Sequence, residues 1–549
     1  MPDDVSAPLP LPSSLHPHSP RPCSRRTFIR EFSGGVAALA AVTLGSGTAL
    51  ASAELWLQPG VADAGSPEQL HLQFGHDASR QVVVSWATAG PVRRPLLRLG
   101  TPDAGFGRTV PAETRTYVDG TSGVAVYTHH AALDGLRPDT HYSYTVQHNG
   151  GTPAAGSFTT APRGRARLRF TSFGDEATPN PGNGLWAPEA AYNPPQVEQL
   201  QPLFHLLNGD LCYANISPDR VKTWRDFFLN NEVSARYRPW MPAAGNHENE
   251  VGNGPFGFRA YQTRFALPDN GETDPNLRGL WYTFKAGSVR VISLNNDDVC
   301  YQDGGDLYVR GYSQGAQKRF LERVLRQTQA ERDTDWLVVC MHQVAISSAR
   351  NFNGADLGVR QEWLPLFDQY GVDLVVCGHE HHYERSLAIR GVDSGTATLR
   401  PHVVEARTDV VDTSKGAVHM IIGGGGTSAP SNALLSDPPV CDVIMGVGPQ
   451  PPTVPGQPRP HRPSTKVSEA ATWVGTRDKE HPYGFASFDV DPGEPGGKTR
   501  MQVTVWDTAP STTGVPTVFE RFTLERPRRD RENERARRDQ ERERRGVGV

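Results

Sequence analysis

The sequence predicts two structured domains, a small all-β sandwich followed by a larger α/β domain. Residues 69–160 contain short runs with strand-like alternation, such as 81–86 and 142–146, separated by turn sequences. This pattern, over a length of about 90 residues, is typical of a β sandwich. From Leu168 onward, strand-like runs alternate with amphipathic helical stretches such as 313–330. Alternating strands and helices favour a mostly parallel sheet that helices cover on both faces.

The first segment, residues 1–53, has the pattern of an export signal and is left out of the predicted fold. Arg25 and Arg26 lie in a run that resembles the twin-arginine signal, and an apolar run rich in Gly and Ala covers 34–50. The alternative is a membrane anchor, but this run is shorter than the ~20 residues that a spanning helix needs. Small residues around Ala51 mark candidate cleavage sites. We therefore predict export by the twin-arginine machinery to a secreted, periplasmic or cell-wall location, without a stable membrane span.

The rest of the chain divides by composition. We expect the sandwich at 66–162, the α/β domain at 168–510 and a charged tail, solvated helix or disordered, at 525–549. Gly, Pro and Ala are frequent in 151–167, which indicates a linker. Further strands are expected at 417–422, 485–490 and 501–506, and the Pro-rich segment 437–468 is expected to be a long surface loop.

Charge and cysteine content limit the function classes. The formal net charge is -4, and residues 525–549 carry ten Arg against seven acidic residues, so the body of the chain is more acidic than the total. An acidic body disfavours nucleic-acid binding, because phosphate neutralisation needs a basic face. Five of the six Cys follow the signal, which is an odd number in an exported protein. Cys340 and Cys377 lie on apolar strands and are expected to be buried, while Cys300 and Cys441 lie in loop-like sequence and are the expected disulfide pair.

Five apolar runs each end in residue types that bind metals. The run Leu206-Leu207-Asn208-Gly209 leads to Asp210, with Tyr213 three residues later. The other runs end at Asp175, at Asn246 and His247, at His342, and at His379 and His381. A carboxylate at the end of a buried strand is costly unless a cation receives it. Because ligands bind outside the carboxyl ends of the strands in open α/β sheets, the pattern predicts a polynuclear metal site at a sheet edge.

Four of these blocks resemble motifs of the purple acid phosphatases, within the calcineurin-like metallophosphoesterases. The blocks are Gly209-Asp210-Leu211-Cys212-Tyr213, Gly245-Asn246-His247-Glu248, Val339-Cys340-Met341-His342 and Gly378-His379-Glu380-His381. The resemblance extends from about Gln69 to Asp507, and Tyr213 narrows it to the purple branch. It implies a sandwich of fibronectin-III or immunoglobulin type, followed by a metallophosphoesterase domain built as a two-sheet β sandwich flanked by helices.

The resemblance also implies a binuclear metal centre. Asp210 would bridge the two ions; Asp175, Tyr213 and His381 would complete the shell of Fe(III); Asn246, His342 and His379 would hold a divalent partner, Fe, Zn or Mn. This division agrees with ligand chemistry, because phenolate and carboxylate suit a hard ferric ion, whereas imidazole and amide oxygen suit a divalent ion. His247, next to a ligand, is implied to be the catalytic residue that contacts the substrate phosphate.

Two features depart from the family pattern. The first block of the family is Asp-x-Gly, whereas this chain has Asp175-Glu176-Ala177, and loss of the Gly could shift the loop. The family also carries a second His about ten residues after its fourth block, but no His occurs between His342 and His379. Protonation of the leaving group would then come from His247, from water, or from a polar residue of the loop 351–353.

The resulting functional hypothesis is an exported binuclear-metal phosphatase that hydrolyses phosphate monoesters by attack of a metal-bound hydroxide. Its expected substrates are small phosphate esters. An alternative keeps the site but hydrolyses phosphodiesters or nucleotides. A different class is a binding protein with a vestigial metal site, which the complete ligand set disfavours. The sequence leaves the oligomeric state open.

Overall fold

The computed structural model describes residues 65–101, 103–454, 459–508, 515–530 and 532–534. The predicted export signal at 1–53 lies outside these residues. Residues from Gly60 onward belong to one compact unit, in which all of the described residues lie. Within the described part of the chain, no helix is long and apolar enough to cross a membrane.

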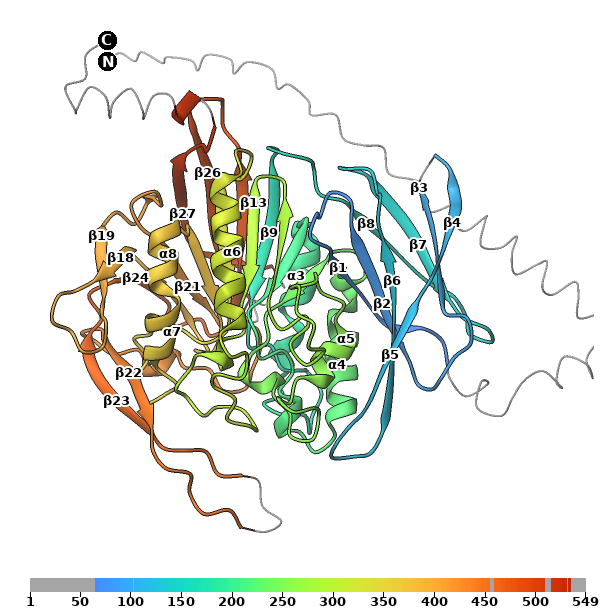
Figure 1. The fold of residues 1–549 in the computed structure, drawn as a ribbon, viewed down its shortest axis with the longest axis horizontal. Helices are drawn as coiled ribbons and strands as arrows, with labels where there is room; N and C mark the ends of the chain where they lie inside the picture. The colour runs from blue at the N-terminus through green and yellow to red at the C-terminus, as the bar shows by residue number, and fades with distance from the viewer. Residues whose placement is uncertain (1–64, 102, 455–458, 509–514, 531, 535–549) are drawn as a thin grey trace, which may run out of the picture. The chain divides into compact units, whose positions relative to one another are not determined.

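The first part of this unit is the predicted β sandwich (Figure 1). Two four-stranded sheets, with strand orders β1-β2-β6-β5 and β4-β3-β7-β8, contain only antiparallel pairs. The strands are β1 (Glu68–Phe74), β2 (Val82–Thr88), β3 (Leu96–Thr101), β4 (Gly105–Pro111), β5 (Glu113–Val118), β6 (Ala125–Leu133), β7 (His141–Gln147) and β8 (Ala154–Thr159). Its core includes Trp86, Tyr144 and Phe158, which are almost fully buried. Large aromatic side chains of this kind supply much of the apolar area that a small domain must bury.

The second part contains two seven-stranded sheets. The first has the order β11-β10-β9-β25-β26-β27-β20, and the second has the order β12-β13-β14-β16-β21-β17-β24. The first comprises β9 (Leu168–Phe173), β10 (Phe204–Leu207), β11 (Trp240–Pro242), β20 (Val410–Asp412), β25 (Gly484–Asp491), β26 (Lys498–Asp507) and β27 (Thr517–Pro527). The second comprises β12 (Tyr282–Ala286), β13 (Val289–Ser293), β14 (Trp336–Cys340), β16 (Leu374–Cys377), β17 (Tyr383–Ser386), β21 (Val418–Ile422) and β24 (Val474–Arg477).

The expectation of one mostly parallel sheet was wrong. Parallel pairing is found in the run β9-β10-β11, in the run β13-β14-β16-β21 and in the pair β20-β27, whereas β25, β26 and β27 form an antiparallel meander beside β9. Strand-like alternation in a sequence does not indicate which strands pair or in which direction, so the strand order of the sheets could not be predicted from it. The two sheets instead form the sandwich, with helices at the flanks, that the family resemblance implied.

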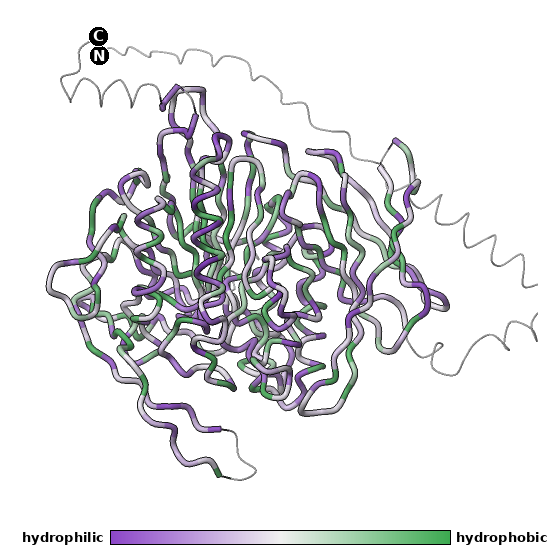
Figure 2. The backbone as a smooth tube through the Cα atoms, viewed as in Figure 1, coloured by the Kyte–Doolittle hydropathy of each residue, from purple (hydrophilic) through white to green (hydrophobic). Residues whose placement is uncertain are grey.

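Helices cover the outer faces of the two sheets. The helices are α3 (Asn193–Leu200), α4 (Arg220–Ala235), α5 (Arg259–Arg264), α6 (Ala316–Ala330), α7 (Leu357–Glu362) and α8 (Leu364–Tyr370), with short 3-10 turns η1 (Pro188–Ala191), η2 (Ala214–Ile216), η3 (Asn246–Glu248), η4 (Asn296–Asp298) and η5 (Asn432–Leu434). In Figure 1, α3, α4 and α5 lie toward the N-terminal sandwich, and α4 packs against β1. The hydrophilic outward side of α6 is visible in Figure 2, whereas Phe320, Leu321 and Leu325 on its other side are buried.

The core of the larger domain lies between its two sheets. Phe170 on β9 stacks on Phe204 and Phe488, with ring centroids 5.1 and 4.5 Å away. The indole Nε1 of Trp336 on β14 donates to Thr499 Oγ1 on β26 at 3.0 Å, which joins the second sheet to the first. Such offset aromatic contacts add to the free energy of apolar burial. The packed layers hold the carboxyl ends of the strands in fixed relative positions.

Two predicted irregular segments are more ordered than expected. The Pro-rich segment 437–468 contains strand β22 (Val440–Val447) and the start of β23 (Ser464–Ala470), which pair as a hairpin and join the short β15 (Ala355–Asp356). A separate two-stranded sheet is formed by β18 (Ala388–Val392) and β19 (Pro401–Glu405). The charged segment 525–549 begins inside β27, where Arg526 Nη1 pairs with Asp373 at 2.7 Å; residues 535–549 lie outside the described part.

The expected disulfide between Cys300 and Cys441 is not formed. Both are buried free thiols, as are Cys212, Cys340 and Cys377. Cys441 lies in strand β22 rather than in a loop, and Cys300 follows the turn η4. An odd count and loop-like neighbours do not fix the distance between two Cβ atoms, which decides whether a bridge can form.

Candidate metal centre

The side chains that the sequence predicted as site residues lie together, at the ends of strands from the two sheets. Asp175 follows β9, Asp210 and Tyr213 follow β10, and Asn246 and His247 lie in η3 after β11; His342 follows β14, and His379 and His381 follow β16. Strands β9, β10 and β11 run parallel to one another in the first sheet, and β14 runs parallel to β16 in the second. Within each sheet the carboxyl ends of these strands therefore lie side by side.

The backbone turns sharply at four of these residues. Asp175, Asp210, Tyr213 and His379 all have positive φ angles, of 59°, 49°, 55° and 73°. Each such conformation costs a non-glycine residue roughly 1–3 kcal/mol, and it persists where the surrounding structure enforces it. The turns aim the side chains across the strand ends instead of along the strands.

One group of polar atoms forms around His381. Its Nε2 lies 3.1 Å from the Tyr213 hydroxyl and 3.3 Å from Asp175 Oδ1. The Tyr213 hydroxyl is also 3.3 Å from the same Asp175 oxygen. Burial, together with the nearby Asp175 and Asp210 carboxylates, raises the pKa of Tyr213 well above its usual range. A phenol in this position loses its proton only when a cation replaces it.

A second group forms around His342. Its Nε2 lies 2.9 Å from Asp210 Oδ2, 3.1 Å from Asn246 Oδ1 and 3.1 Å from His379 Nδ1. Ligand atoms of Asp210, His342 and His379 all lie within 4.8 Å of one another. Burial alone would lower the pKa of His342, but the Asp210 carboxylate outweighs burial and raises it to about 10. A buried carboxylate thus has its compensating positive charge on an imidazole, a position that a metal ion can take instead.

The hydrogen bonds on the outer side of His342 and His381 show which ring nitrogen of each faces the cluster. His342 Nδ1 lies 2.7 Å from the carbonyl of Asn208, and His381 Nδ1 lies 2.7 Å from that of Ala429. A carbonyl can only accept, so both rings carry a proton on Nδ1, and Nε2 is the nitrogen that faces inward and can offer its lone pair when a metal ion replaces its proton. Interactions of this kind orient imidazole ligands and fix their tautomer in metal sites.

The same arrangement holds for the other two ligands of the second group. His379 Nε2 lies 2.5 Å from Gln302 Oε1, which leaves Nδ1 facing the cluster. The side-chain amide of Asn246 donates to the carbonyl of Gly304 at 3.1 Å, so its oxygen points inward. Three imidazole nitrogens, an amide oxygen, two carboxylates and a phenol therefore converge, and this donor set fits cations once the protons that His342 Nε2 and the phenol carry are displaced.

The loop Asp175-Glu176-Ala177, which differs from the family pattern, remains paired with the loop that carries Asp210. Asp175 N donates to Gly209 O at 3.1 Å, Glu176 N to Asp210 O at 3.3 Å and Ala177 N to Leu211 O at 3.1 Å. Glu176 itself points away from the cluster, where it accepts from the side-chain amides of Asn230 and Asn231 on α4. The loop that carries Asp175 is thus paired residue by residue with the loop that carries Asp210.

Glycines next to the ligands leave no room for a side chain. A Cβ at Gly378 would lie 2.4 Å from Asp175 Oδ2, and one at Gly245 would lie 2.3 Å from Asp210 Oδ1. Glu248 completes the turn, because its carboxylate accepts from the backbone N–H groups of Asp210, Leu211 and Gly245 at 2.7–2.9 Å. The motif glycines and Glu248 therefore hold the candidate ligands in position.

His247 lies beside the cluster and does not belong to either group. Its backbone N–H donates to Asp210 Oδ1 at 2.8 Å, and its Nδ1 lies 2.7 Å from Asn215 Oδ1. The other ring nitrogen, Nε2, is 4.0 Å from Asp210 Oδ2. This places an imidazole at the open side of the cluster.

An open cavity of about 420 Å³ lies over this side. Its lining includes Asp210, Asn246, His247 and His381, and also residues that the sequence did not single out as site residues: Leu185, Gln302, Asp303, Gly304, Phe352, Ala429, His461, Arg462 and Ser464, with Asn353 from the loop named above. Of these, Asp303 and His461 carry groups able to bind or release protons, but both lie in irregular segments without a sequence pattern that would have marked them.

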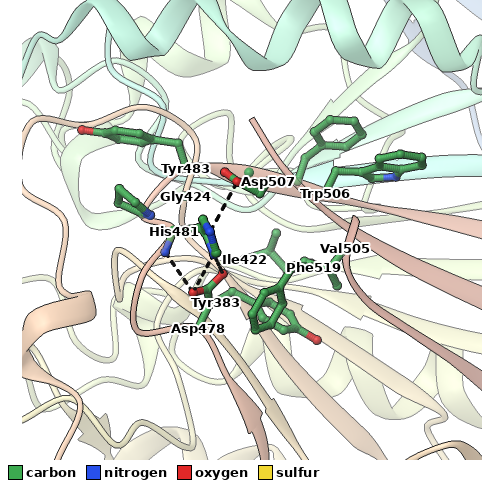
Figure 3. A pocket seen from close by; sticks show the side chains of 13 residues that line it. Tyr383, Ile422, Gly424, Asp478, His481, Tyr483, Val505, Trp506, Asp507 and Phe519 are labelled. Carbon is green, nitrogen blue, oxygen red and sulfur yellow. Dashed lines mark hydrogen bonds and ion pairs between the residues drawn. The ribbon is translucent and has the colours of Figure 1, made fainter. Parts of the chain in front are cut away.

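A second cavity, shown in Figure 3, is lined by Tyr383, His481, Asp507 and Phe519 among others. Its volume is only about 20 Å³. His481 is already paired there with Asp478 at 3.1 Å. A volume of this size holds about one water molecule, so the cavity has no room for a substrate.

Comparison with known proteins agrees with the geometry. Residues 67–160 match the family described as Purple acid Phosphatase, N-terminal domain, and residues 188–383 match Calcineurin-like phosphoesterase. Two uncharacterized proteins of Mycobacterium tuberculosis strains are 53% identical over 524 residues, which is 93% of this chain and 97% of theirs. The Fe(3+)-Zn(2+) purple acid phosphatase 12 of Arabidopsis thaliana is 27% identical, with 68% of this chain and 74% of that protein covered. A solved purple acid phosphatase from yellow lupin seeds has the same fold, with a TM-score of 0.59 and 20% identity over 85% of this chain and 75% of that one.

Proposed function

The chain belongs to the purple acid phosphatases within the calcineurin-like phosphoesterases and is a metal-dependent phosphoester hydrolase, and we propose that it hydrolyses phosphate monoesters at a centre of two metal ions. The observation that carries this proposal is the orientation of the imidazoles. Each of the three has one ring nitrogen held by an oxygen acceptor of the surrounding structure, while the other nitrogen faces the cluster, against a carboxylate for His342 and His381 and against His342 for His379. In a protein that no longer bound metals, selection would not maintain this orientation of the three imidazoles.

We assign the donors to two ions of different character. Asp175, Tyr213 and His381 suit a ferric ion; Asn246, His342 and His379 suit a divalent ion, Fe, Zn or Mn; and Asp210 would reach both. When bound, such a pair of ions supplies a nucleophilic water at neutral or acidic pH and neutralises charge on the phosphate.

The residues around the centre would position the ester. His247 has its Nδ1 held by Asn215, so the ring is oriented with its other nitrogen free to contact a phosphate oxygen. A donor fixed before the reaction stabilises the charge that develops in the transition state without further reorganisation. His247 therefore acts on the substrate and not on the metals.

A second candidate function, hydrolysis of phosphodiesters or nucleotides, is supported by a neighbouring cavity of about 480 Å³. Tyr308, Arg310, Arg459 and Arg462 line this cavity, and Arg462 also lines the cavity over the metal centre. Aromatic and cationic groups here suit a large anionic leaving group.

The test compares two variants of the metal-loaded protein. Asp210→Asn removes a ligand of both ions, so we expect metal content and hydrolysis of p-nitrophenyl phosphate to fall together. His247→Ala is expected to keep both metals and to lose turnover by roughly 10²–10³-fold. Wild-type protein that binds metals but hydrolyses no monoester would refute the proposed activity, and hydrolysis of only a diester would favour the second candidate. Equal metal loss in both variants would refute the separate roles.

The export route is a further part of the proposal. Arg25 and Arg26 in a signal of twin-arginine type would direct export of the folded protein, so that metals can bind before export. Replacing both by Lys should leave precursor inside the cell. Undiminished export of that variant would exclude the route.

A further inference from the structure

Residues 459–464, which we call the strap, form a wall of the metal cavity that comes from far along the chain. The strap leads into β23, and its residues His461, Arg462 and Ser464 line the cavity together with His247 and Asp210. The strap follows a Pro-rich stretch of the β22–β23 connection, and none of the family blocks includes it. Its side chains therefore reach the cavity through a contact between segments that are far apart in the sequence.

Asp303 holds the strap in place. Its fully buried carboxylate accepts from Arg459 Nη1 at 2.8 Å and Nη2 at 2.5 Å, and from the backbone N–H of Arg462 at 3.0 Å. Bidentate pairs of this kind are among the stronger and more directional contacts in proteins. Asp303 also follows Gln302, the residue that orients His379, so the strap and the ligand share one supporting loop.

The same carboxylate orients His461. The imidazole Nδ1 lies 3.4 Å from Asp303 Oδ1, and its side chain remains 53% exposed. Among the described residues, none is hydrogen-bonded to its Nε2. The hydrogen bond from Nδ1 to this carboxylate orients the ring at the cavity wall, and Nε2 is the nitrogen that Asp303 does not engage.

Three other residues at the cavity are poorly suited to give a proton to the ester oxygen. Asn353 Nδ2 donates to the carbonyl of His379, and its Oδ1 accepts from Gln302, so both ends of this amide are occupied. Phe352 carries no exchangeable proton. His247 is tied to Asn215 and faces Asp210, on the side where the phosphate would lie.

We propose that His461 is the residue that protonates the leaving oxygen of the ester. This inference rests on the proposed monoesterase function. An oxygen derived from water forms a bond to phosphorus, the bond between phosphorus and the ester oxygen breaks, and its electron pair stays on that oxygen. The Nε2–H of the His461 imidazolium supplies the proton that completes the alcohol. The half-exposed ring then recovers a proton from solvent, which balances the proton released by the attacking water.

This role makes a prediction that depends on the leaving group. An alkoxide is too basic to leave unprotonated, and a positioned general acid contributes about 10²–10⁴-fold to such a step. A nitrophenolate leaves readily without a proton. Removing the acid should therefore slow an alkyl phosphate strongly and p-nitrophenyl phosphate little, whereas damage to the metal centre slows both.

The experiment measures kcat and KM of the metal-loaded full chain for glycerol 2-phosphate and p-nitrophenyl phosphate. His461→Gln is expected to lose about 100-fold or more in kcat on the alkyl ester and less than about fivefold on the aryl ester, with metal content unchanged. His402→Gln is the matched control, because His402 is 55% exposed and its Nδ1 likewise lies 2.7 Å from a carboxylate, that of Asp393, on β19 away from the cavity. This control should change neither rate.

Results other than a selective loss on the alkyl ester in His461→Gln overturn the inference. An unchanged alkyl rate in His461→Gln, or equal losses on both esters, would refute the role of His461 while leaving the monoesterase proposal intact. A leaving-group-dependent loss in His247→Ala in place of His461→Gln would assign the proton to His247. Wild-type protein inactive on both esters would refute the proposed function and this inference together.

Discussion

Gly378→Ala tests whether the ligand positions depend on the close approach of strand ends from the two sheets. The added Cβ would lie 2.4 Å from Asp175 Oδ2, 2.7 Å from Asn208 O and 3.1 Å from His342 Nδ1. Two of these three atoms belong to residues assigned to different metal ions. A side chain at 378 therefore presses on both halves of the centre at once.

The size of the effect follows from these distances. A carbon–oxygen contact is comfortable at about 3.3 Å or more, so the Asp175 carboxylate must retreat by roughly 0.9 Å. That exceeds the ~0.5 Å within which a metal or catalytic site must be held. The retreat also disturbs the bond from His379 N to Asp175 Oδ2, which is now 2.9 Å. We expect a 10–100-fold loss of metal affinity and about 1–3 kcal/mol of lost stability from overpacking.

The assay is metal retention during titration with a chelator, together with urea unfolding of the metal-free protein. Gly446→Ala, on β22, is the control, because a Cβ there has no atom within 4 Å and the residue has no positive φ. The control should bind metal and unfold as wild type does. If Gly378→Ala held both metals with wild-type affinity, the argument that this glycine permits the ligand geometry would be wrong.

Three further predictions concern the centre, the pH dependence of stability and the thiols. Iron-loaded wild-type protein should be coloured by charge transfer from the Tyr213 phenolate to Fe(III), and Tyr213→Phe should lose the visible band; a colourless iron-loaded wild type would refute the ferric assignment. Burial lowers the pKa of His71 from 6.5 to about 4, so the unfolded chain binds this proton more readily and stability is lost as pH falls from about 6.5 toward 4. His71 contributes about 2 kcal/mol to the loss of stability between pH 7 and pH 5. Other buried histidines with lowered pKa values, such as His129 and His419, add to the loss in both proteins, so urea unfolding should show a loss smaller by about 2 kcal/mol in His71→Gln than in wild type; equal losses would refute it. A thiol reagent should leave the five buried thiols of the described residues, Cys212, Cys300, Cys340, Cys377 and Cys441, unmodified in the folded protein and should react with all five after denaturation, whereas a disulfide would leave only three of them reactive.

The sequence predicted the parts of the site that depend on local pattern. An apolar run followed by a polar residue is encoded within about ten residues, and this pattern marked Asp210, His342 and His379, with a Gly directly before Asp210 and His379. The strands that carry them are buried, as their composition predicted. The family resemblance then supplied the two-sheet architecture, which strand alternation alone had not indicated.

The parts that escaped prediction depend on contacts between distant segments. Gln302 reaches His379, and His461 reaches Asp303, across 77 and 158 residues of sequence. Neither segment has a hydrophobic period that would place it. The position of the strap follows from one buried carboxylate that accepts from an arginine and a backbone amide, and such a pairing is visible only in three dimensions.

The altered first block shows how a motif can change without moving its ligand. Where the family has Gly, Ala177 adopts a φ of 66°, a left-handed conformation that costs a residue with a Cβ roughly 1–2 kcal/mol. Three backbone hydrogen bonds, from Asp175, Glu176 and Ala177 to the loop of Asp210, contribute about 0.5–1.5 kcal/mol each. Their sum is enough to offset the strain, so the loop stays in register with its neighbour. The position of Asp175 is therefore set by the pairing of two loops, and the motif glycine is one way of permitting that pairing but is not required for it.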